Sequence, residues 1–206
     1  EVDIAEELQR SLDEDDARAP ELARELTRRL PFEPYRRKCG HIAQKLRRSL
    51  DHARVHDPVF FRDDPLPPDP CRYHRREELL ADLAILDRSL RAHGGVAVAA
   101  GALRDVTREV EVFGLHLATL DVRQHSDRHT AALTEIFARA GVSADYHALA
   151  EGDRAATVAR ALEDPRPLVP LRASFSPEVH EVIATFHAIA AVTEELSPEA
   201  IQKVIV

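Results

Sequence analysis

The chain has 206 residues, 44% of them hydrophobic and 31% charged, which is typical of a folded globular protein rather than a disordered or fibrous one. Its formal net charge of −8 argues against a nucleic-acid-binding protein, because such proteins need excess positive charge to displace counterions from phosphates. The two cysteines, Cys39 and Cys71, are too few for a disulfide framework, and neither has zinc-binding spacing. Because no apolar stretch is long enough to cross a membrane, we expect a cytoplasmic protein without membrane contact.

Helical periodicity dominates the first 55 residues. Apolar residues three and four apart predict two short helices, built on Ile4, Leu8 and Leu12 and on Leu22, Leu26 and Leu30. Pro20 suits the first turn of the second helix. A third helix is predicted from Glu33 to about Val55, with a basic outer face formed by Arg36, Arg37, Lys38, Lys45, Arg47 and Arg48. Residues 57–70, DPVFFRDDPLPPDP, contain five prolines and four aspartates and predict a long surface loop.

The rest of the chain is predicted to combine helices with two strands. Helices are expected over residues 75–90, 102–113, 126–140, 154–162 and 176–192. Gly94 and Gly95 suit the end of the first of these, and Ser126 suits the N-cap of the third. Residues 116–124, HLATLDVRQ, are the clearest strand candidate, and the terminal KVIV run predicts a second strand. This order favours an α/β protein with a parallel sheet and many helices.

Arg123 is the residue of the predicted strand that most strongly suggests binding chemistry. Alternation places Leu117, Thr119, Asp121 and Arg123 on one face of the strand. Arg123 lies at the C-terminal end, the edge at which α/β barrels and open α/β sheets hold their ligands. A guanidinium there can receive a carboxylate or phosphate through two parallel hydrogen bonds. The alternative is a structural ion pair between Arg123 and Asp121, because an unpaired charge on a buried strand is costly.

The sequence around this strand resembles that of phosphoenolpyruvate carboxylases. Residues 110–133, VEVFGLHLATLDVRQHSDRHTAAL, match the family pattern of FGL, a short variable stretch that has four residues here, LD-hydrophobic-RQ-E-S and RHT. Upstream, EPYR at residues 33–36 and the basic helix after it look like a family signature, and PEVHEVIATFHAIAAV with the terminal VIV resembles the approach to the next barrel strand. Two positions differ. His125 replaces the usual Glu, exchanging an acceptor for a possible donor, and Lys203 and Val204 stand where the family favours Tyr-Val.

The resemblance implies a predominantly α-helical segment of an α/β protein, part of a (β/α)8-type barrel with many added helices. Residues 1–206 are expected to be an internal segment of that single domain, which also fits the lack of an initiating Met at Glu1. Residues 57–70 would be its Pro/Asp-rich loop, and residues 116–124 a barrel strand with a substrate-facing end. The implied enzyme adds bicarbonate to phosphoenolpyruvate, giving oxaloacetate and phosphate and replenishing the tricarboxylic acid cycle. It uses Mg2+ or Mn2+, whose ligands lie outside this segment, and is expected to be a homo-oligomer.

The same resemblance assigns roles to individual residues. The family arginine that matches Arg123 belongs to the phosphoenolpyruvate site, so Arg123 is the expected substrate-binding residue, with Asp121, Gln124 and His125 around it. The family's catalytic histidine and metal carboxylates have no counterpart in residues 1–206, so the segment alone is expected to be inactive. Arg36, within the EPYR match, is a candidate for binding a sugar-phosphate effector. Its alternative is a solvated basic face balanced by the acidic N-terminal helices.

Two alternatives concern the class of the protein and the histidines. His125 and His129 are four residues apart, so on a helix they could hold a metal together. The zinc-protease pattern needs Glu directly after the first His, however, and Ser126 stands there, which favours surface or capping histidines. The chain could also be a non-catalytic helical interaction module that retains the fold without the chemistry.

Overall fold

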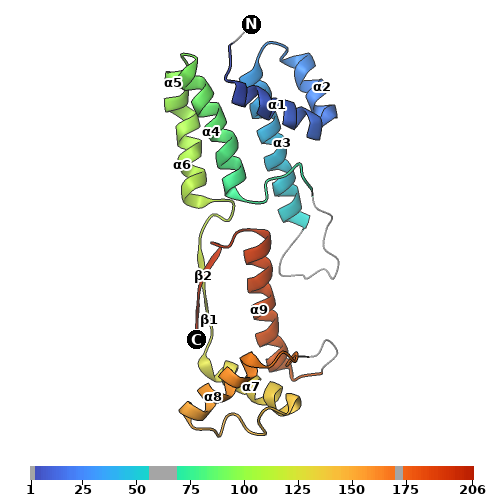
Figure 1. Ribbon diagram of the computed structural model, residues 1–206, viewed down its shortest axis with the longest axis vertical. Helices are drawn as coiled ribbons and strands as arrows, with labels where there is room; N and C mark the ends of the chain where they lie inside the picture. Colours follow the sequence, from blue (N-terminus) through green and yellow to red (C-terminus); the bar gives the residue numbers. More distant parts are fainter. Residues whose placement is uncertain (1–2, 56–68, 170–173) are drawn as a thin grey trace. The chain divides into compact units, whose positions relative to one another are not determined.

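The computed structural model describes residues 3–55, 69–169 and 174–206, so the predicted loop at 57–70 lies outside the described residues except at its last two positions. The elements are α1 (Glu6–Arg18), α2 (Pro20–Arg29), α3 (Pro34–Val55), α4 (Arg76–Ala92), α5 (Val96–Val98), η1 (Ala99–Leu103), α6 (Arg104–Phe113), β1 (Leu120–Arg123), α7 (Ser126–Ala140), α8 (Glu151–Glu163), α9 (Pro177–Glu195) and β2 (Ile201–Ile205) (Figure 1). They form two compact units, Glu1–Ala118 with Glu195–Ala200 and Thr119–Glu194 with Ile201–Val206.

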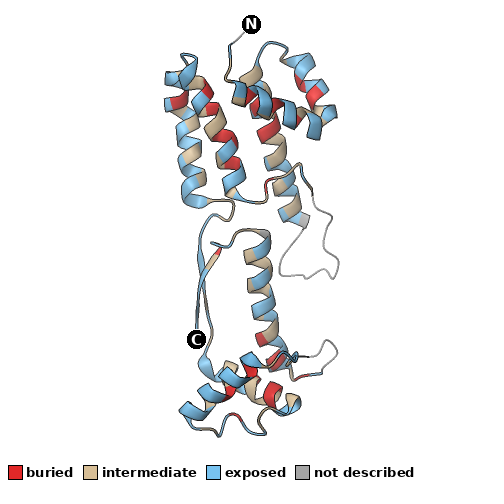
Figure 2. Cartoon of the chain, viewed as in Figure 1, coloured by how far each residue is buried: buried red, intermediate tan, exposed pale blue. Residues whose placement is uncertain are grey.

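The first unit is a helical body in which α4 contacts α1, α3, α5, η1 and α6. Its core consists of apolar residues on the inward faces of these helices and on the segment before α4: Leu8, Leu12, Ile42, Tyr73, Leu79, Leu83 and Leu86 (Figure 2). The three-and-four spacing of Leu8 and Leu12 therefore marked a buried face, as predicted. Burying one such leucine contributes about 1.5–3 kcal/mol.

The ends of several helices agree with the sequence signals. Pro20 occupies the first turn of α2, and Gly94 follows α4 with a φ of +82°, a conformation that favours glycine at a helix end. Before α6, the chain is already helical from Val96, earlier than predicted. Gly101 departs from helical geometry there, with φ −97° and ψ −127°, so a kink divides what would otherwise be one helix.

The second unit packs α7, α8 and α9 around a separate core. The buried residues are Ala132, Ile136, Phe137, Tyr146, Ala161, Phe175, Val179 and Val182. The rings of Phe137 and Tyr146 meet edge to face with centroids 5.2 Å apart, a favoured aromatic geometry. Gly141, with a φ of +71°, ends α7.

β1 and β2 form a parallel pair, which confirms the predicted arrangement. Asp121 lies opposite Lys203 and Arg123 opposite Ile205, and the register shifts between Leu120 and Asp121. The predicted strand at 116–124 was too long, because β1 covers only Leu120–Arg123. Leu117 has a φ of +64°, which a strand cannot contain, so it does not share a face with Arg123 as alternation suggested.

Three further details differ from or add to the predictions. Ser126 is the first residue of α7 rather than its cap; His125 is the N-cap, and its side chain accepts a hydrogen bond from Asp127 N. The basic residues of α3 do not all lie on an outer face, since Lys38 is fully buried. No helix in the described part of the chain is long and apolar enough to cross a membrane.

Candidate functional site at the end of β1

Arg123 ends β1 with an exposed guanidinium. Its side chain is 74% exposed, and its Nη2 lies 3.7 Å from Asp121 Oδ2. That separation is too long for a hydrogen bond, and an exposed ion pair of this kind contributes little stability. The structural pairing suggested as an alternative therefore exists only as a loose contact, and no other described residue engages the donors of Arg123.

The residues after Arg123 fix the start of α7. Gln124 N donates to Ile205 O at 3.1 Å, which extends the strand pairing by one residue, while its side-chain Oε1 is buried and has no hydrogen-bond partner among the described residues. His125 Nδ1 accepts from Asp127 N at 3.3 Å. His125 thus acts as an acceptor, as a Glu at this position could, rather than as the donor that the sequence suggested.

The two histidines that could have formed a metal pair have separate surroundings. His125 caps α7, whereas the ring of His129 packs edge-on against Phe186 of α9 with centroids 5.8 Å apart. Nε2 of His129 is buried and finds no partner in the described ranges. Within those ranges, no group of three or more His, Cys, Asp or Glu side chains is arranged to hold a metal ion.

The segment that leads into β1 has an unusual backbone. Gly114 adopts φ +56° and ψ −143°, and a Cβ there would lie 2.9 Å from two ring atoms of His116, so only glycine fits. Ala118 N donates to His116 O at 2.7 Å across Leu117, whose φ is +64°. This is a γ-turn with a positive φ, a rare and strained conformation. Such strain is often found close to functional sites.

Arg36 lies at the start of α3, away from this strand end in sequence. Its Nη1 contacts Glu33 Oε2 at 2.7 Å, and its side chain is 67% exposed. A cavity of about 400 Å3 lies further along α3, lined by residues that include Arg18, Lys45 and Arg48 but not Arg36. The effector role of Arg36 stays a prediction.

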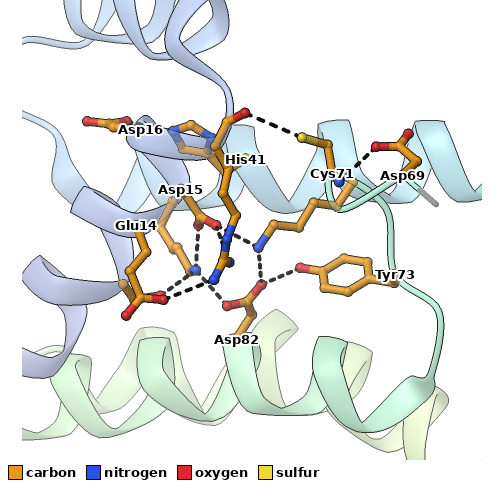
Figure 3. A network of polar contacts seen from close by, with 12 residues as sticks. Glu14, Asp15, Asp16, His41, Asp69, Cys71, Tyr73 and Asp82 are labelled. Carbon is orange, nitrogen blue, oxygen red and sulfur yellow. Dashed lines mark hydrogen bonds and ion pairs between the residues drawn. The ribbon is translucent and has the colours of Figure 1, made fainter. Parts of the chain in front are cut away.

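A buried ionic network in the first unit was not anticipated from the sequence (Figure 3). The Nζ atom of Lys38 donates to Asp15 at 2.7 Å and to Asp82 at 2.6 Å, and Lys45 Nζ contacts the same two carboxylates at 2.7 and 3.0 Å. The Tyr73 hydroxyl donates to Asp82. The side chains of Lys38 and Asp15 are 0% and 2% exposed. Two positive charges thus neutralise two negative ones inside the helical body.

The protonation of this network follows from those contacts. Burial opposes the charged form of Asp82, but hydrogen bonds from Lys38 and Tyr73 outweigh it and lower the pKa of the carboxyl below its ordinary value. Burial likewise opposes the charge of Lys45, yet Asp15 and Asp82 raise the pKa of its ammonium. Burial, together with the charge of Asp82, raises the pKa of the Tyr73 hydroxyl. The carboxyl of Asp82 and the ammonium of Lys45 are therefore both charged at neutral pH.

The parallel pair of β1 and β2 and the exposed Arg123 define a segment of an α/β protein. This segment presents a guanidinium at the C-terminal end of a parallel strand. The sequence model of the phosphoenolpyruvate carboxylase family matches residues 1–206. The phosphoenolpyruvate carboxylase of Roseiflexus castenholzii is 51% identical over 203 residues, which are 98% of this chain and 21% of that protein. The enzymes of Burkholderia vietnamiensis and Burkholderia mallei are 37% and 42% identical over 84% and 66% of this chain, and 18% and 14% of their own lengths.

The chain therefore belongs to the phosphoenolpyruvate carboxylase family, which confirms the resemblance seen around β1. It spans about a fifth of the length of the curated relatives it matches. Residues 3–55, 69–169 and 174–206 are mostly helical with one parallel strand pair, as in a segment of an α/β protein.

Proposed function

We propose that this chain supplies one anion-binding arginine to a phosphoenolpyruvate carboxylase, an enzyme that joins bicarbonate to phosphoenolpyruvate and releases oxaloacetate and phosphate. One observation carries the proposal: Arg123 ends a parallel strand with a 74% exposed side chain, whose one ion-pair contact in the described part of the chain is the 3.7 Å approach to Asp121. Ligands of α/β proteins bind at this end of the strands. In the complete protein, β1 and β2 would be neighbouring strands of a (β/α)8-type barrel.

The chemistry of the proposed substrate suits a guanidinium. Phosphoenolpyruvate carries a phosphate and a carboxylate, and the planar fork of Arg123 can bind either through two parallel hydrogen bonds. When the phosphoryl group leaves, negative charge develops on the phosphoryl and enolate oxygens. A fixed cation that binds more strongly as this charge grows lowers the barrier rather than only tightening substrate binding.

The family also implies a divalent cation, Mg2+ or Mn2+, which would polarise the oxygens of the substrate when bound. The described residues of this chain do not provide a site for it, since they contain no suitable group of His, Cys, Asp or Glu side chains. The role that we assign to this chain is therefore limited to binding and orienting the anionic substrate.

Substituting Arg123 in the full-length enzyme tests the proposal. Lysine keeps the charge but loses the planar fork, so Arg123→Lys should lower kcat/KM for phosphoenolpyruvate by roughly 10- to 1000-fold, and Arg123→Ala by more. Arg128→Lys is the matched control, because Arg128 is also exposed but is engaged by Glu181 at 2.7 Å. A folded Arg123→Lys enzyme with unchanged kcat/KM would reduce Arg123 to the structural partner of Asp121.

A further inference from the structure

Arg76, the first residue of α4, lies in the first unit and binds two segments that are distant from it in sequence. Its Nη2 donates to Glu199 Oε1 at 2.7 Å, and its Nη1 donates to the backbone oxygen of Glu111 at 3.4 Å. Its Nε donates to the neighbouring Glu77 at 3.0 Å. The side chain is only 26% exposed, so it lies against the helical body rather than extending into solvent.

Each distant partner of Arg76 lies on the N-terminal side of one strand of the sheet. Glu111 lies in the last turn of α6, before the strained turn that contains Gly114 and Leu117 and leads into β1. Glu199 lies two residues before Ile201, the first residue of β2. The guanidinium therefore joins the end of the helix before β1 to the turn before β2, although its two partners come from opposite ends of the second half of the chain.

Glu199 is held in a fixed position for this contact. Its backbone N–H donates to Ser197 Oγ at 3.1 Å, and Ala200 N donates to Ser197 O at 3.0 Å, so residues 197–200 form a serine-initiated turn. Ala200 is 3% exposed. The turn at Ser197 and the buried Ala200 thus fix the backbone on both sides of Glu199. Because the backbone is already fixed, forming the ion pair with Arg76 costs little conformational entropy.

The aliphatic part of Arg76 also covers the turn before β1. Its Cδ lies 3.6 Å from the position that a Cβ on Gly114 would occupy. From this turn the chain needs only a few residues to reach Arg123, and the register shift between Leu120 and Asp121 lies on the way. Bulges and register shifts re-aim the side chains that follow them. The direction of Arg123 therefore depends on where the two strands begin relative to each other.

We propose that Arg76 is a positioning residue for the reaction: by holding together the two segments that lead into β1 and β2, it sets the register that aims Arg123. The inference rests on the proposed function of Arg123, and Arg76 itself does not touch substrate. The contacts that carry it are the 2.7 Å pair with Glu199 and the 3.4 Å bond to the Glu111 carbonyl. Small displacements of a binding group are costly, because a shift of about 1 Å can change a rate by roughly 100-fold.

The test uses steady-state kinetics and thermal unfolding of the full-length enzyme. Arg76→Ala should lower kcat/KM for phosphoenolpyruvate by roughly 10- to 100-fold at temperatures well below unfolding, whereas the control Arg104→Ala should leave it unchanged. Arg104 is an equally basic residue of the same unit, and within the described ranges it pairs with its exposed neighbour Asp105 alone, at 3.1 Å. The charge-swapped double variant Arg76→Glu/Glu199→Arg should recover part of the loss, because it rebuilds the pair in reverse.

The outcomes separate this inference from the proposed function. If Arg123→Lys lowers kcat/KM but Arg76→Ala does not, only the positioning role is overturned. If Arg123→Lys is unchanged, the proposed function fails, and this inference fails with it. A lower melting temperature in Arg76→Ala with unchanged kcat/KM would show a merely structural contact. In the Arg123→Ala background, the positioning role predicts that adding Arg76→Ala causes little further loss; a full additional loss would also contradict it.

Discussion

The buried network on α1, α3 and α4 gives the sharpest stability prediction. Lys38→Met removes a 0% exposed ammonium but keeps a side chain of similar length. The change deletes hydrogen bonds to Ser11 at 2.7 Å, to Asp15 at 2.7 Å and to Asp82 at 2.6 Å. It leaves two buried carboxylates with Lys45 as their single ammonium partner within the network.

The expected cost follows from that charge imbalance. Removing one partner of a buried ionic network typically destabilises a protein by roughly 3–5 kcal/mol, because the remaining charge is left uncompensated. An exposed pair contributes far less, about 0.3–0.5 kcal/mol for charges one helical turn apart. Arg29→Met is therefore the matched control, since Arg29 pairs with Glu25 at 2.9 Å with both side chains more than half exposed.

Urea unfolding of the 206-residue chain, followed by circular dichroism, measures the difference. With a slope of about 2 kcal/mol per molar urea, the Lys38→Met midpoint should fall by roughly 1.5–2.5 M, and the Arg29→Met midpoint by about 0.2 M. The double variant Lys38→Met/Asp82→Leu restores charge balance and should recover part of the loss. Equal midpoints for Lys38→Met and Arg29→Met would refute the claim that the buried network stabilises this unit.

The pH dependence gives a second readout of the same network. The pKa of Asp82 is lowered in the folded state, so the unfolded chain binds a proton at this residue more readily. The stabilisation from ionised Asp82 is complete at pH values above its ordinary pKa of 3.8. It is lost as the pH falls through the lower pKa of the folded state. The pKa of Lys45 is raised above 10.5, so its contribution is lost as the pH rises beyond that value. In Lys38→Met the acid-induced loss below pH 3.8 should be smaller.

Three further predictions concern other parts of the chain. Gly114→Ala introduces a Cβ 2.9 Å from His116 at a φ of +56°. It should destabilise the chain by about 1–3 kcal/mol and so lower the urea midpoint by roughly 0.5–1.5 M. An unchanged midpoint would contradict the described turn. Phe137→Ala should destabilise the second unit by about 3–5 kcal/mol, seen as faster hydrogen exchange in α7 and α9; wild-type exchange would show that the ring is not part of the core. Arg36→Ala breaks an exposed contact to Glu33, the one ion pair that Arg36 makes with the described residues. Basal turnover of the full-length enzyme should therefore persist while any activation by sugar phosphates weakens. Full activation would favour a solvated basic face.

Local sequence patterns were sufficient for most elements of the fold. Three of these patterns are the apolar spacing of Leu8 and Leu12, the proline at the start of α2 and the glycine after α4. Each depends on residues within one or two helical turns, so the helices could be located without knowledge of the elements packed against them. Neighbouring residues also sufficed to place Arg123 at the end of a strand, because the signal for α7 begins only three residues after it, at Ser126.

Long-range contacts decided what local patterns could not. Sequence periodicity gave Lys38 a place on a basic helix, but its burial depends on Asp15 and Asp82, which are 23 and 44 residues away. The pairing of Arg76 with Glu199 spans 123 residues, and no local signal marks it. A charged side chain looks the same in sequence whether it is solvated or buried in a pair, because only the folded chain brings its partner within hydrogen-bonding distance. Tertiary structure therefore determined which of these charges stabilise the fold, while the sequence by itself determined the helices, the parallel strands and the arginine at their end.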